Sequence, residues 1–191
     1  MALGNVIGSN IANVGLILGV AALIRPPRVD GALRRRELPV LVASTALVPL
    51  LLLDGSVSRW EGGGLLVGAV SVARALGMSE RLVGLTIVAV GTSLPELVTS
   101  VIAARRGHSD LAVGNVVGSN IFNTFLCLGA ASLAGSVAAP LPTLGVDLAA
   151  LGVMTALAAA FIRTERTISR REGATAVVLY AAFAVVTVAR G

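Results

Sequence analysis

The chain has 191 residues, of which 55% are hydrophobic and only 13% are charged, and its mean hydropathy is +0.90. This apolar share is above that of soluble domains and is typical of an integral membrane protein. The formal net charge is +5, and all 15 basic residues are arginine. A basic balance of this kind is also found in nucleic-acid-binding proteins, but this chain has no soluble basic domain, so we expect no nucleic-acid partner.

Six apolar runs predict transmembrane helices, and most of them reach or approach the roughly 20 residues that a spanning helix needs. The runs cover residues 10–24, 38–53, 82–104, 111–134, 146–162 and 173–189. A further stretch, residues 62–77, is short, rich in glycine and interrupted by Arg74. We expect this stretch to be interfacial or re-entrant, or to be the remnant of a region that once held two spans.

The arginines gather in three of the segments between these runs. They lie at Arg25–Arg36, at Arg105 and Arg106, and at Arg163–Arg171, whereas residues 135–145 contain none. Loops on the cytoplasmic side of a membrane carry an excess of basic residues. We therefore expect the three arginine segments to be cytoplasmic and the loop around Pro140 to lie on the other side.

An internal repeat organises the chain. A shift of 110 positions brings ALGNVIGSNIAN, which begins at Ala2, onto AVGNVVGSNIFN, which begins at Ala112. The apolar run 38–53 then falls on 148–163, and one residue further along SRWEG (58–62) falls on SRREG (169–173). An internal repeat of this kind determines the architecture, so the fold has to be assigned from the repeat.

Glu96 lies inside a predicted spanning segment. Placing a charged carboxylate in the membrane is energetically unfavourable, so such a residue marks a functional site by default. Pro95 and Gly91 interrupt the helix around it, which frees backbone carbonyls that are tolerated only beside protein, water or an ion. The neighbouring oxygen donors are the Thr92 and Ser93 hydroxyls and the carbonyls near Ala89 and Thr92. An all-oxygen set of this kind suits hard cations such as Ca²⁺ and Na⁺.

The stretch GNVVGSNIFN, residues 114–123, supplies a second polar wall. Gly114 and Gly118 are four residues apart, a spacing that lets another helix approach closely, and Ser119 and Asn123 share one helical face. For the glycines, simple helix packing is an equal alternative. For Ser119 and Asn123 the alternative is hydrogen bonding between helices without contact to an ion.

The combination of GLTIVAVGTSLPEL and GNVVGSNIFN, with the partial second copy GNVIGSNIAN, resembles the α-repeats of the calcium/cation antiporter family, in particular the bacterial sodium/calcium exchangers. The resemblance implies ten spans in two inverted five-span halves, each of which gives one glutamate motif and one Ser/Asn motif to a midplane ion site. It implies that Glu96 and the Thr92 carbonyl bind Ca²⁺. It implies Na⁺ contacts for Ser93 and the Ala89 carbonyl, and polar walls from Ser119, Asn123, Ser9 and Asn13, with Gly4 and Gly8 as the first copy of the glycine motif.

The sequence departs from the family pattern at its start, because Met1 directly precedes the first GNVIGSN and the first GTSxPE glutamate is absent. We therefore expect an all-α integral membrane protein with an incomplete, exchanger-like inverted-repeat bundle of about six spans plus one short helix. Residues 1–62 are expected to form a partial first repeat and residues 63–191 the second, with a complete α-repeat motif at 84–134. Position 123 is Asn where some exchangers have Asp, which keeps an oxygen ligand but removes a charge.

The expected function is membrane cation antiport, Na⁺/Ca²⁺ exchange or exchange of Ca²⁺ for another cation, in a multi-pass protein of the bacterial inner membrane. The expected partners are inorganic cations and membrane lipid, and no cofactor is expected beyond the transported ions. For the absent helices the alternatives are a truncated or mis-started gene product, a decayed paralogue, or a second chain that supplies the missing helices. The alternative is a non-transporting remnant or an assembly subunit. We expect no enzyme, because the sole histidine, His108, has no nucleophile or metal partner in view, and the sole cysteine, Cys127, lies in an apolar run where it packs.

Overall fold

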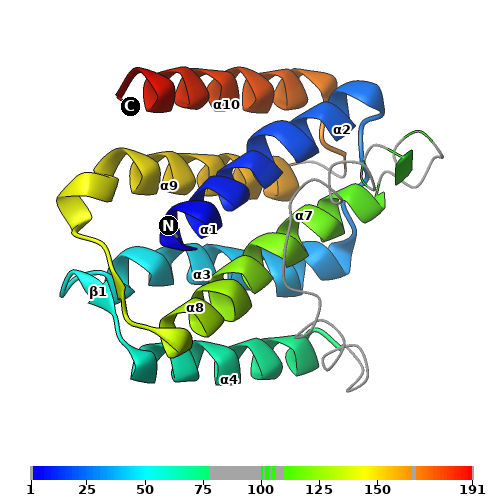
Figure 1. Cartoon of the computed structure of the whole chain (residues 1–191). Helices are drawn as coiled ribbons and strands as arrows, with labels where there is room; N and C mark the ends of the chain where they lie inside the picture. Colours follow the sequence, from blue (N-terminus) through cyan, green and yellow to red (C-terminus); the bar gives the residue numbers. More distant parts are fainter. Residues whose placement is uncertain are drawn as a thin grey trace.

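The computed structural model describes residues 2–77, 100, 102–103, 105, 110–164 and 167–190. In this part the chain forms a bundle of long helices that lie lengthwise beside one another (Figure 1). The elements are α1 (Ala2–Ala12), η1 (Asn13–Leu18), α2 (Gly19–Ile24), η2 (Leu33–Glu37), α3 (Leu38–Leu51), β1 (Ser56–Val57), α4 (Arg59–Ala75), α7 (Asp110–Phe122), η3 (Asn123–Cys127), α8 (Leu128–Ala134), β2 (Val137–Ala138), α9 (Leu141–Thr164) and α10 (Arg170–Arg190).

Four helical segments of the described part are long and apolar enough to cross a membrane: Ala2–Ile24, Leu111–Ala134, Leu141–Thr164 and Arg170–Arg190. The first two each combine two α-helices with a π-helical turn between them. The predicted run 38–53 forms α3, and the predicted run 82–104 lies almost entirely outside the described residues. The expected all-α membrane bundle is confirmed, and the chain is a multi-pass integral membrane protein.

The helices α4 and α10 begin in the same way because the sequence repeats its start signal. At α4 the Ser58 backbone N–H donates to the Glu61 carboxylate at 2.8 Å, and the Glu61 N–H donates back to the Ser58 hydroxyl at 3.3 Å. At α10 Ser169 and Glu172 make the same pair of bonds at 2.7 and 3.3 Å. This reciprocal cap satisfies backbone donors that a helix start otherwise leaves free.

Most of the stretch 62–77 lies in α4, which packs beside α8 in the bundle (Figure 1). Its interfacial or re-entrant position, and its origin as a remnant of two spans, stay predictions. Gly62 lies against Gly129 and Leu133, and Gly68 lies against Phe125, so the two helices are antiparallel. Gly62, one of the glycines that made this stretch look like a poor span, lets its backbone approach the partner helix closely.

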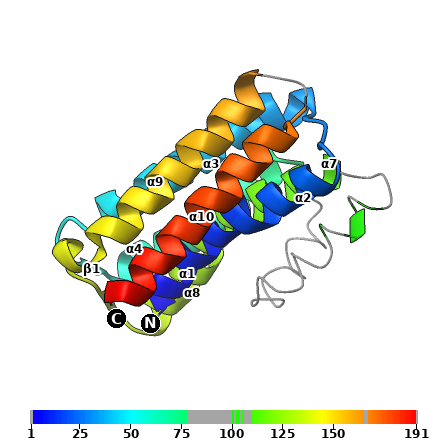
Figure 2. The ribbon, with the colours of Figure 1, turned by 90° about the horizontal axis from the view of Figure 1, so that it is seen from above.

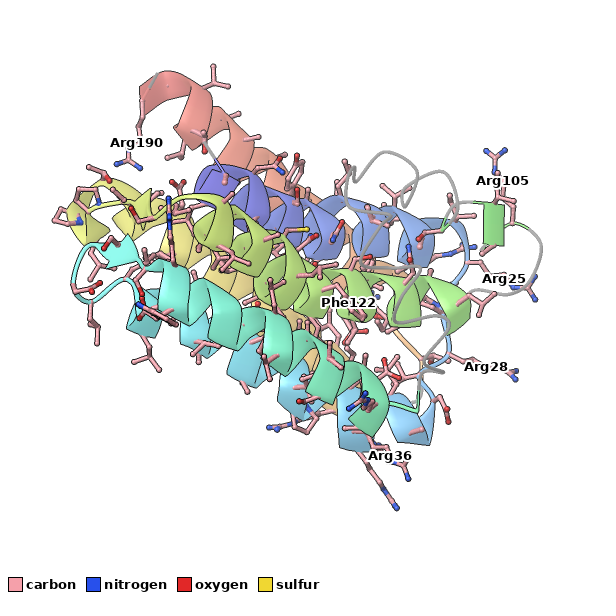
Figure 3. All side chains as sticks on the ribbon, turned by 60° about the horizontal axis from the view of Figure 1, so that its bottom comes forward. Arg25, Arg28, Arg36, Arg105, Phe122 and Arg190 are labelled. Carbon is pink, nitrogen blue, oxygen red and sulfur yellow. The ribbon has the colours of Figure 1, made fainter. Side chains whose placement is uncertain are left out.

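The two repeats run in opposite directions through the bundle. The helix Ala2–Ile24 leads from the end that holds both chain termini to the opposite end, and the helix Leu111–Ala134 leads back (Figures 1 and 2). Arg25, Arg28, Arg36 and Arg105 lie at one end of the bundle and Arg190 at the other (Figure 3). The arginine segments thus share one end, and its assignment to the cytoplasm remains a prediction.

Backbone pairing at both ends shows the same inverted symmetry. At the end that holds the termini, β1 and β2 pair antiparallel, with Ser56 opposite Ala138. At the arginine end, Arg28 forms an isolated antiparallel bridge with Thr167. Arg28 is the repeat counterpart of Ala138 at the shift of 110, and Thr167 is the counterpart of Ser56 at the later shift of 111. Each pairing therefore joins one repeat to the other, and the symmetry exchanges the two ends.

Two close contacts between glycines join the repeats, and each contact pairs a glycine of one repeat with a glycine of the other. A Cβ atom added to Gly62 would lie 2.9 Å from the Gly129 carbonyl oxygen, and one added to Gly173 would lie 2.8 Å from the Gly19 carbonyl oxygen. Side-chain atoms essentially never approach a backbone this closely, so both positions require glycine. We call these contacts, Gly62–Gly129 and Gly19–Gly173, the two glycine seams.

The arginine end also carries a partly buried acidic residue, Glu37. Glu37 lies directly before α3. Burial raises the pKa of the Glu37 carboxyl above its ordinary value, and the nearby Asp30 carboxylate adds to that effect. Because both causes disfavour the charged form, Glu37 takes up a proton more readily than a free glutamate.

Candidate cation site

The predicted site residues fall into two groups in the structure. Ser9 and Asn13 lie on the helix Ala2–Ile24, and Ser119 and Asn123 lie on the helix Leu111–Ala134. The glutamate motif lies outside the described residues, so the predicted roles of Glu96, Thr92, Ser93, Ala89, Gly91 and Pro95 stay predictions.

The two central helices meet at a cluster of asparagines. Asn13 donates from Nδ2 to the Asn120 Oδ1 at 2.8 Å, and Asn123 donates from Nδ2 to the Asn10 Oδ1 at 2.9 Å. Asn10, Asn13 and Asn120 are each only 1% exposed. Both contacts cross from one repeat to the other, so each predicted wall asparagine is bonded by an asparagine of the opposite repeat.

Asn10 and Asn120 are also bonded to one another. The Asn10 Nδ2 donates to the Asn120 carbonyl oxygen at 3.4 Å, and the Asn120 Nδ2 donates to the Asn10 carbonyl oxygen at 3.1 Å. Thr124 accepts a further bond from the Asn10 Nδ2 at 3.3 Å. None of these three residues is among the predicted ligands. A signal for the two asparagines exists, because the motif GSN occurs in both copies of the repeat.

The helices change their winding at the predicted wall residues. The π-helical turn η1 begins at Asn13 and η3 begins at Asn123, which are counterparts in the repeat. Short π-helical turns inside α-helices are frequent at functional sites. Both asparagines thus lie where the regular backbone pattern is interrupted.

Asn13 has one atom without a partner in the described part of the chain. Its Oδ1 is buried and accepts no hydrogen bond from any described residue. A buried polar atom left without a partner costs about 1–3 kcal/mol, so such an atom calls for an explanation. A carboxamide oxygen is also a ligand for hard cations.

Other metal chemistry is not supported by the residues around this cluster. Within the described ranges, no three His, Cys, Asp or Glu side chains gather closely enough to hold a metal ion. The donors are amide and hydroxyl oxygens, which are typical ligands of Na⁺ and Ca²⁺ and not of transition metals.

The predicted close approach at the motif glycines is not seen among the described residues. A Cβ atom on Gly4, Gly8 or Gly118 would meet no described heavy atom within 4 Å, and on Gly114 it would meet only Leu33, at 4.0 Å. The closest helix contacts occur instead at the two glycine seams. A packing role of the motif glycines therefore stays a prediction.

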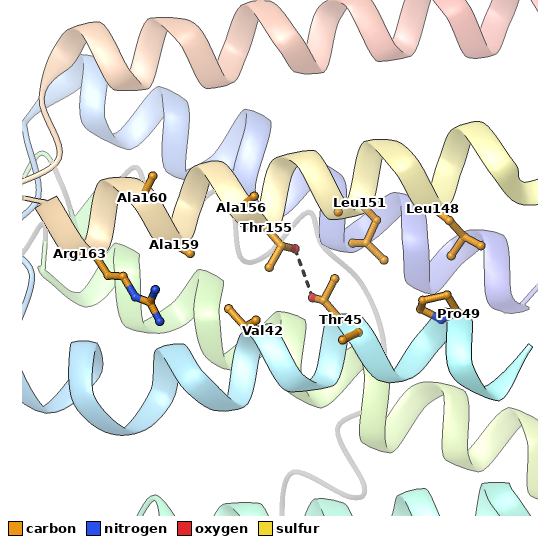
Figure 4. Close-up of a pocket in the computed structure, with 12 residues that line it drawn as sticks. Val42, Thr45, Pro49, Leu148, Leu151, Thr155, Ala156, Ala159, Ala160 and Arg163 are labelled. Atoms are coloured by element: carbon orange, nitrogen blue, oxygen red, sulfur yellow. Dashed lines mark hydrogen bonds between the residues drawn. The ribbon is translucent and has the colours of Figure 1, made fainter.

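A groove lies between α3 and α9 (Figure 4), and none of the four asparagines of the cluster lines it. It has a volume of about 540 Å³ and a mainly apolar lining, with Arg163 at one end. In its floor the hydroxyls of Thr45 and Thr155 lie 3.2 Å apart and share a hydrogen bond across positions separated by 110 residues. With its two hydroxyls already paired, this groove is a poor site for a desolvated cation.

Comparison with known protein families and structures identifies the same architecture. The family model described as "Sodium/calcium exchanger protein" matches residues 1–68 and 64–189. Among curated proteins, the chain is 32% identical to the inner membrane protein YrbG of Escherichia coli over 70% of its own length and 60% of that protein. It is 28% identical to the sodium/calcium exchanger MaX1 of Methanosarcina acetivorans, covering 96% of this chain and 79% of that protein.

The fold agrees with a solved exchanger. A structure of the sodium-calcium exchanger NCX_Mj, soaked without Na⁺ and Ca²⁺, matches 98% of this chain and 76% of its own chain with a TM-score of 0.77 and 28% identity. The chain spans about 60% of the length of the Escherichia coli relative. Since the family model covers almost the whole sequence in two matches, one for each repeat, this chain belongs to the sodium/calcium exchanger family.

Proposed function

We propose that this chain binds Na⁺ and Ca²⁺ at the asparagine cluster and acts in the exchange of these cations across the bacterial inner membrane. The observation that carries the proposal is the buried Asn13 Oδ1, an acceptor without a described partner at the crossing of two inverted repeats. The names of the relatives support it, since MaX1 is named a sodium/calcium exchanger and NCX_Mj a sodium-calcium exchanger.

The proposed residue roles are those that the resemblance to the exchanger family implies. Glu96 supplies the carboxylate and Thr92 its carbonyl oxygen for Ca²⁺, and Ser93 and the Ala89 carbonyl serve Na⁺. Ser9, Asn13, Ser119 and Asn123 supply neutral oxygen donors around the ions. The ions are cargo and no separate cofactor is required, and the protein moves them without catalysing a chemical reaction.

The electrostatics explain why a partner belongs to the proposal. One carboxylate beside one divalent cation leaves a net charge of +1 in a low-dielectric site, which is unfavourable by several kcal/mol. A second chain that brings another carboxylate would neutralise this charge. Lipid surrounds the rest of the bundle, and nucleic acid has no place in this mechanism.

A second candidate is a non-transporting remnant or assembly subunit. The observation that favours it is that the amides of Asn10, Asn13, Asn120 and Asn123 already bond one another between the two central helices. Such a protein would keep the glycine seams and the asparagine contacts for assembly and would not move ions.

Thermal unfolding of the purified chain in detergent, with and without Ca²⁺, separates the two candidates. We expect Ca²⁺ to raise the unfolding temperature, because a ligand that binds only the folded state stabilises it. Glu96→Gln should abolish this rise. Glu172→Gln is the matched control, because it changes a glutamate at the start of α10 to a residue that still caps a helix. A Ca²⁺ shift that survives Glu96→Gln contradicts the site, and no shift in the unmutated chain favours the remnant.

A further inference from the structure

Asn10 and Asn120 occupy the centre of the helix crossing without being predicted ligands. Both are 1% exposed, and each donates its Nδ2 to the backbone carbonyl of the other, at 3.4 and 3.1 Å. Their side chains are therefore held by the opposite helix. The Oδ1 atom of each one therefore has a fixed position.

Each of these Oδ1 atoms accepts a hydrogen bond from the side-chain nitrogen of a wall asparagine, Asn13 or Asn123. The Asn120 Oδ1 accepts from the Asn13 Nδ2 at 2.8 Å, and the Asn10 Oδ1 accepts from the Asn123 Nδ2 at 2.9 Å. A carboxamide has one nitrogen end, which only donates, and one oxygen end, which only accepts. Once the nitrogen end is engaged, the position of the oxygen end is fixed.

We propose that Asn10 and Asn120 are positioning residues that orient the carboxamides of Asn123 and Asn13, so that oxygen and not NH₂ faces the cation. This inference rests on the proposed function, because it concerns the same site. A flipped carboxamide would turn two N–H donors toward a positive ion, which repels them. The orientation therefore decides whether the wall attracts or rejects a cation.

The carboxamides that the two positioning residues orient are not equally restrained. The Asn123 Oδ1 also accepts a bond from the Cys127 thiol at 3.6 Å, which gives this carboxamide a second restraint. The Asn13 Oδ1 has no partner among the described residues. The orientation of Asn13 therefore depends more strongly on Asn120 than the orientation of Asn123 depends on Asn10.

A double-mutant cycle on Ca²⁺ binding by the purified full chain tests the proposal. Asn120→Leu should weaken Ca²⁺ binding about tenfold, in line with the loss of one well-placed polar contact. In an Asn13→Ala background the same change should have no further effect, because the carboxamide that it orients is gone. Additive losses of affinity would overturn the proposal.

Two further variants separate positioning from simple support of the fold. Thr45→Val removes another hydrogen bond between repeat counterparts and should lower the unfolding temperature while Ca²⁺ affinity stays unchanged. Asn120→Asp keeps an oxygen acceptor for the Asn13 Nδ2 and should keep the affinity at or above that of the unmutated chain. Equal loss of affinity in Asn120→Leu and Asn120→Asp would contradict the assigned role.

A readout without any ion keeps the inference separate from the proposed function. In protein labelled with ¹⁵N-asparagine, the Asn13 carboxamide protons should exchange slowly with solvent, and their NMR signals are assigned by loss in Asn13→Asp. Asn120→Leu should make this exchange fast, and Thr45→Val should not. If the unmutated chain binds no Ca²⁺, the proposed function fails, and the exchange measurement alone decides the positioning role. Slow exchange that persists in Asn120→Leu overturns it.

Discussion

The two wall asparagines are repeat counterparts, yet their oxygen atoms have different surroundings. The Asn123 Oδ1 accepts a bond from Cys127, four residues further along its helix. The position equivalent to Cys127 in the first repeat is Ile17, which has no donor, and the Asn13 Oδ1 has no partner in the described part. The two carboxamide oxygens thus differ in their hydrogen-bond partners, although their backbone positions are equivalent. We infer that the first repeat supplies the freer oxygen and the second a restrained one.

The glycine seams, in contrast, are alike in both repeats, and we expect the largest effects there. Gly62→Ala and Gly173→Ala should each destabilise the protein by about 1–3 kcal/mol, because the added carbon meets backbone and cannot be accommodated without movement. Unfolding in detergent, followed by circular dichroism, measures this.

Gly64→Ala is the control for the glycine seams, since Gly64 lies on α4 and an added Cβ would meet no heavy atom of the described residues within 4 Å. It should be neutral or stabilising by up to about 1 kcal/mol, because alanine favours a helix. If Gly62→Ala lowered the stability strongly and Gly173→Ala did not, the two glycine seams would not contribute equally to the stability of the fold.

A smaller effect is expected from making the two wall asparagines alike. Ile17→Cys places a thiol four residues after Asn13, as Cys127 lies after Asn123. The new thiol should compete for the Asn13 Oδ1 and weaken Ca²⁺ binding about two- to fivefold, the effect of one weak hydrogen bond. Ile17→Val is the control, since it also removes volume at this buried position but adds no donor. Equal affinities of the two variants would mean that the free oxygen of Asn13 is not the important difference.

The sequence is sufficient for the parts of the fold that its repeat encodes. The pairing of SRWEG with SRREG predicts that α4 and α10 are counterparts, and both helices begin with the same cap. For residues 62–77 the sequence is less informative, because glycines and Arg74 lower the hydrophobicity of the stretch, and the expected interfacial, re-entrant or remnant character stays a prediction. Local composition cannot show that these glycines face another backbone, as Gly62 faces Gly129.

The sequence predicts only those residues of the candidate site whose role can be inferred from a single helix. Asn123 is a candidate because it shares a helical face with Ser119, and Asn13 is a candidate because the family resemblance places it in the same polar wall. Asn10 and Asn120 are not predictable in this way, because their role depends on a contact between helices 110 residues apart in sequence. The sequence carries both asparagines twice, but it does not show which helix meets which.

The most direct test of the account is the Ca²⁺ affinity of Asn13→Leu, measured by isothermal titration of the purified chain. We expect a loss of Ca²⁺ affinity of about tenfold or more, because a buried cation loses an oxygen ligand and leucine offers none. Asn5→Leu is the matched control, since Asn5 is an exposed asparagine on the same helix, and its affinity should equal that of the unmutated chain. Unchanged Ca²⁺ affinity in Asn13→Leu would contradict the claim that the Asn13 oxygen faces the cation.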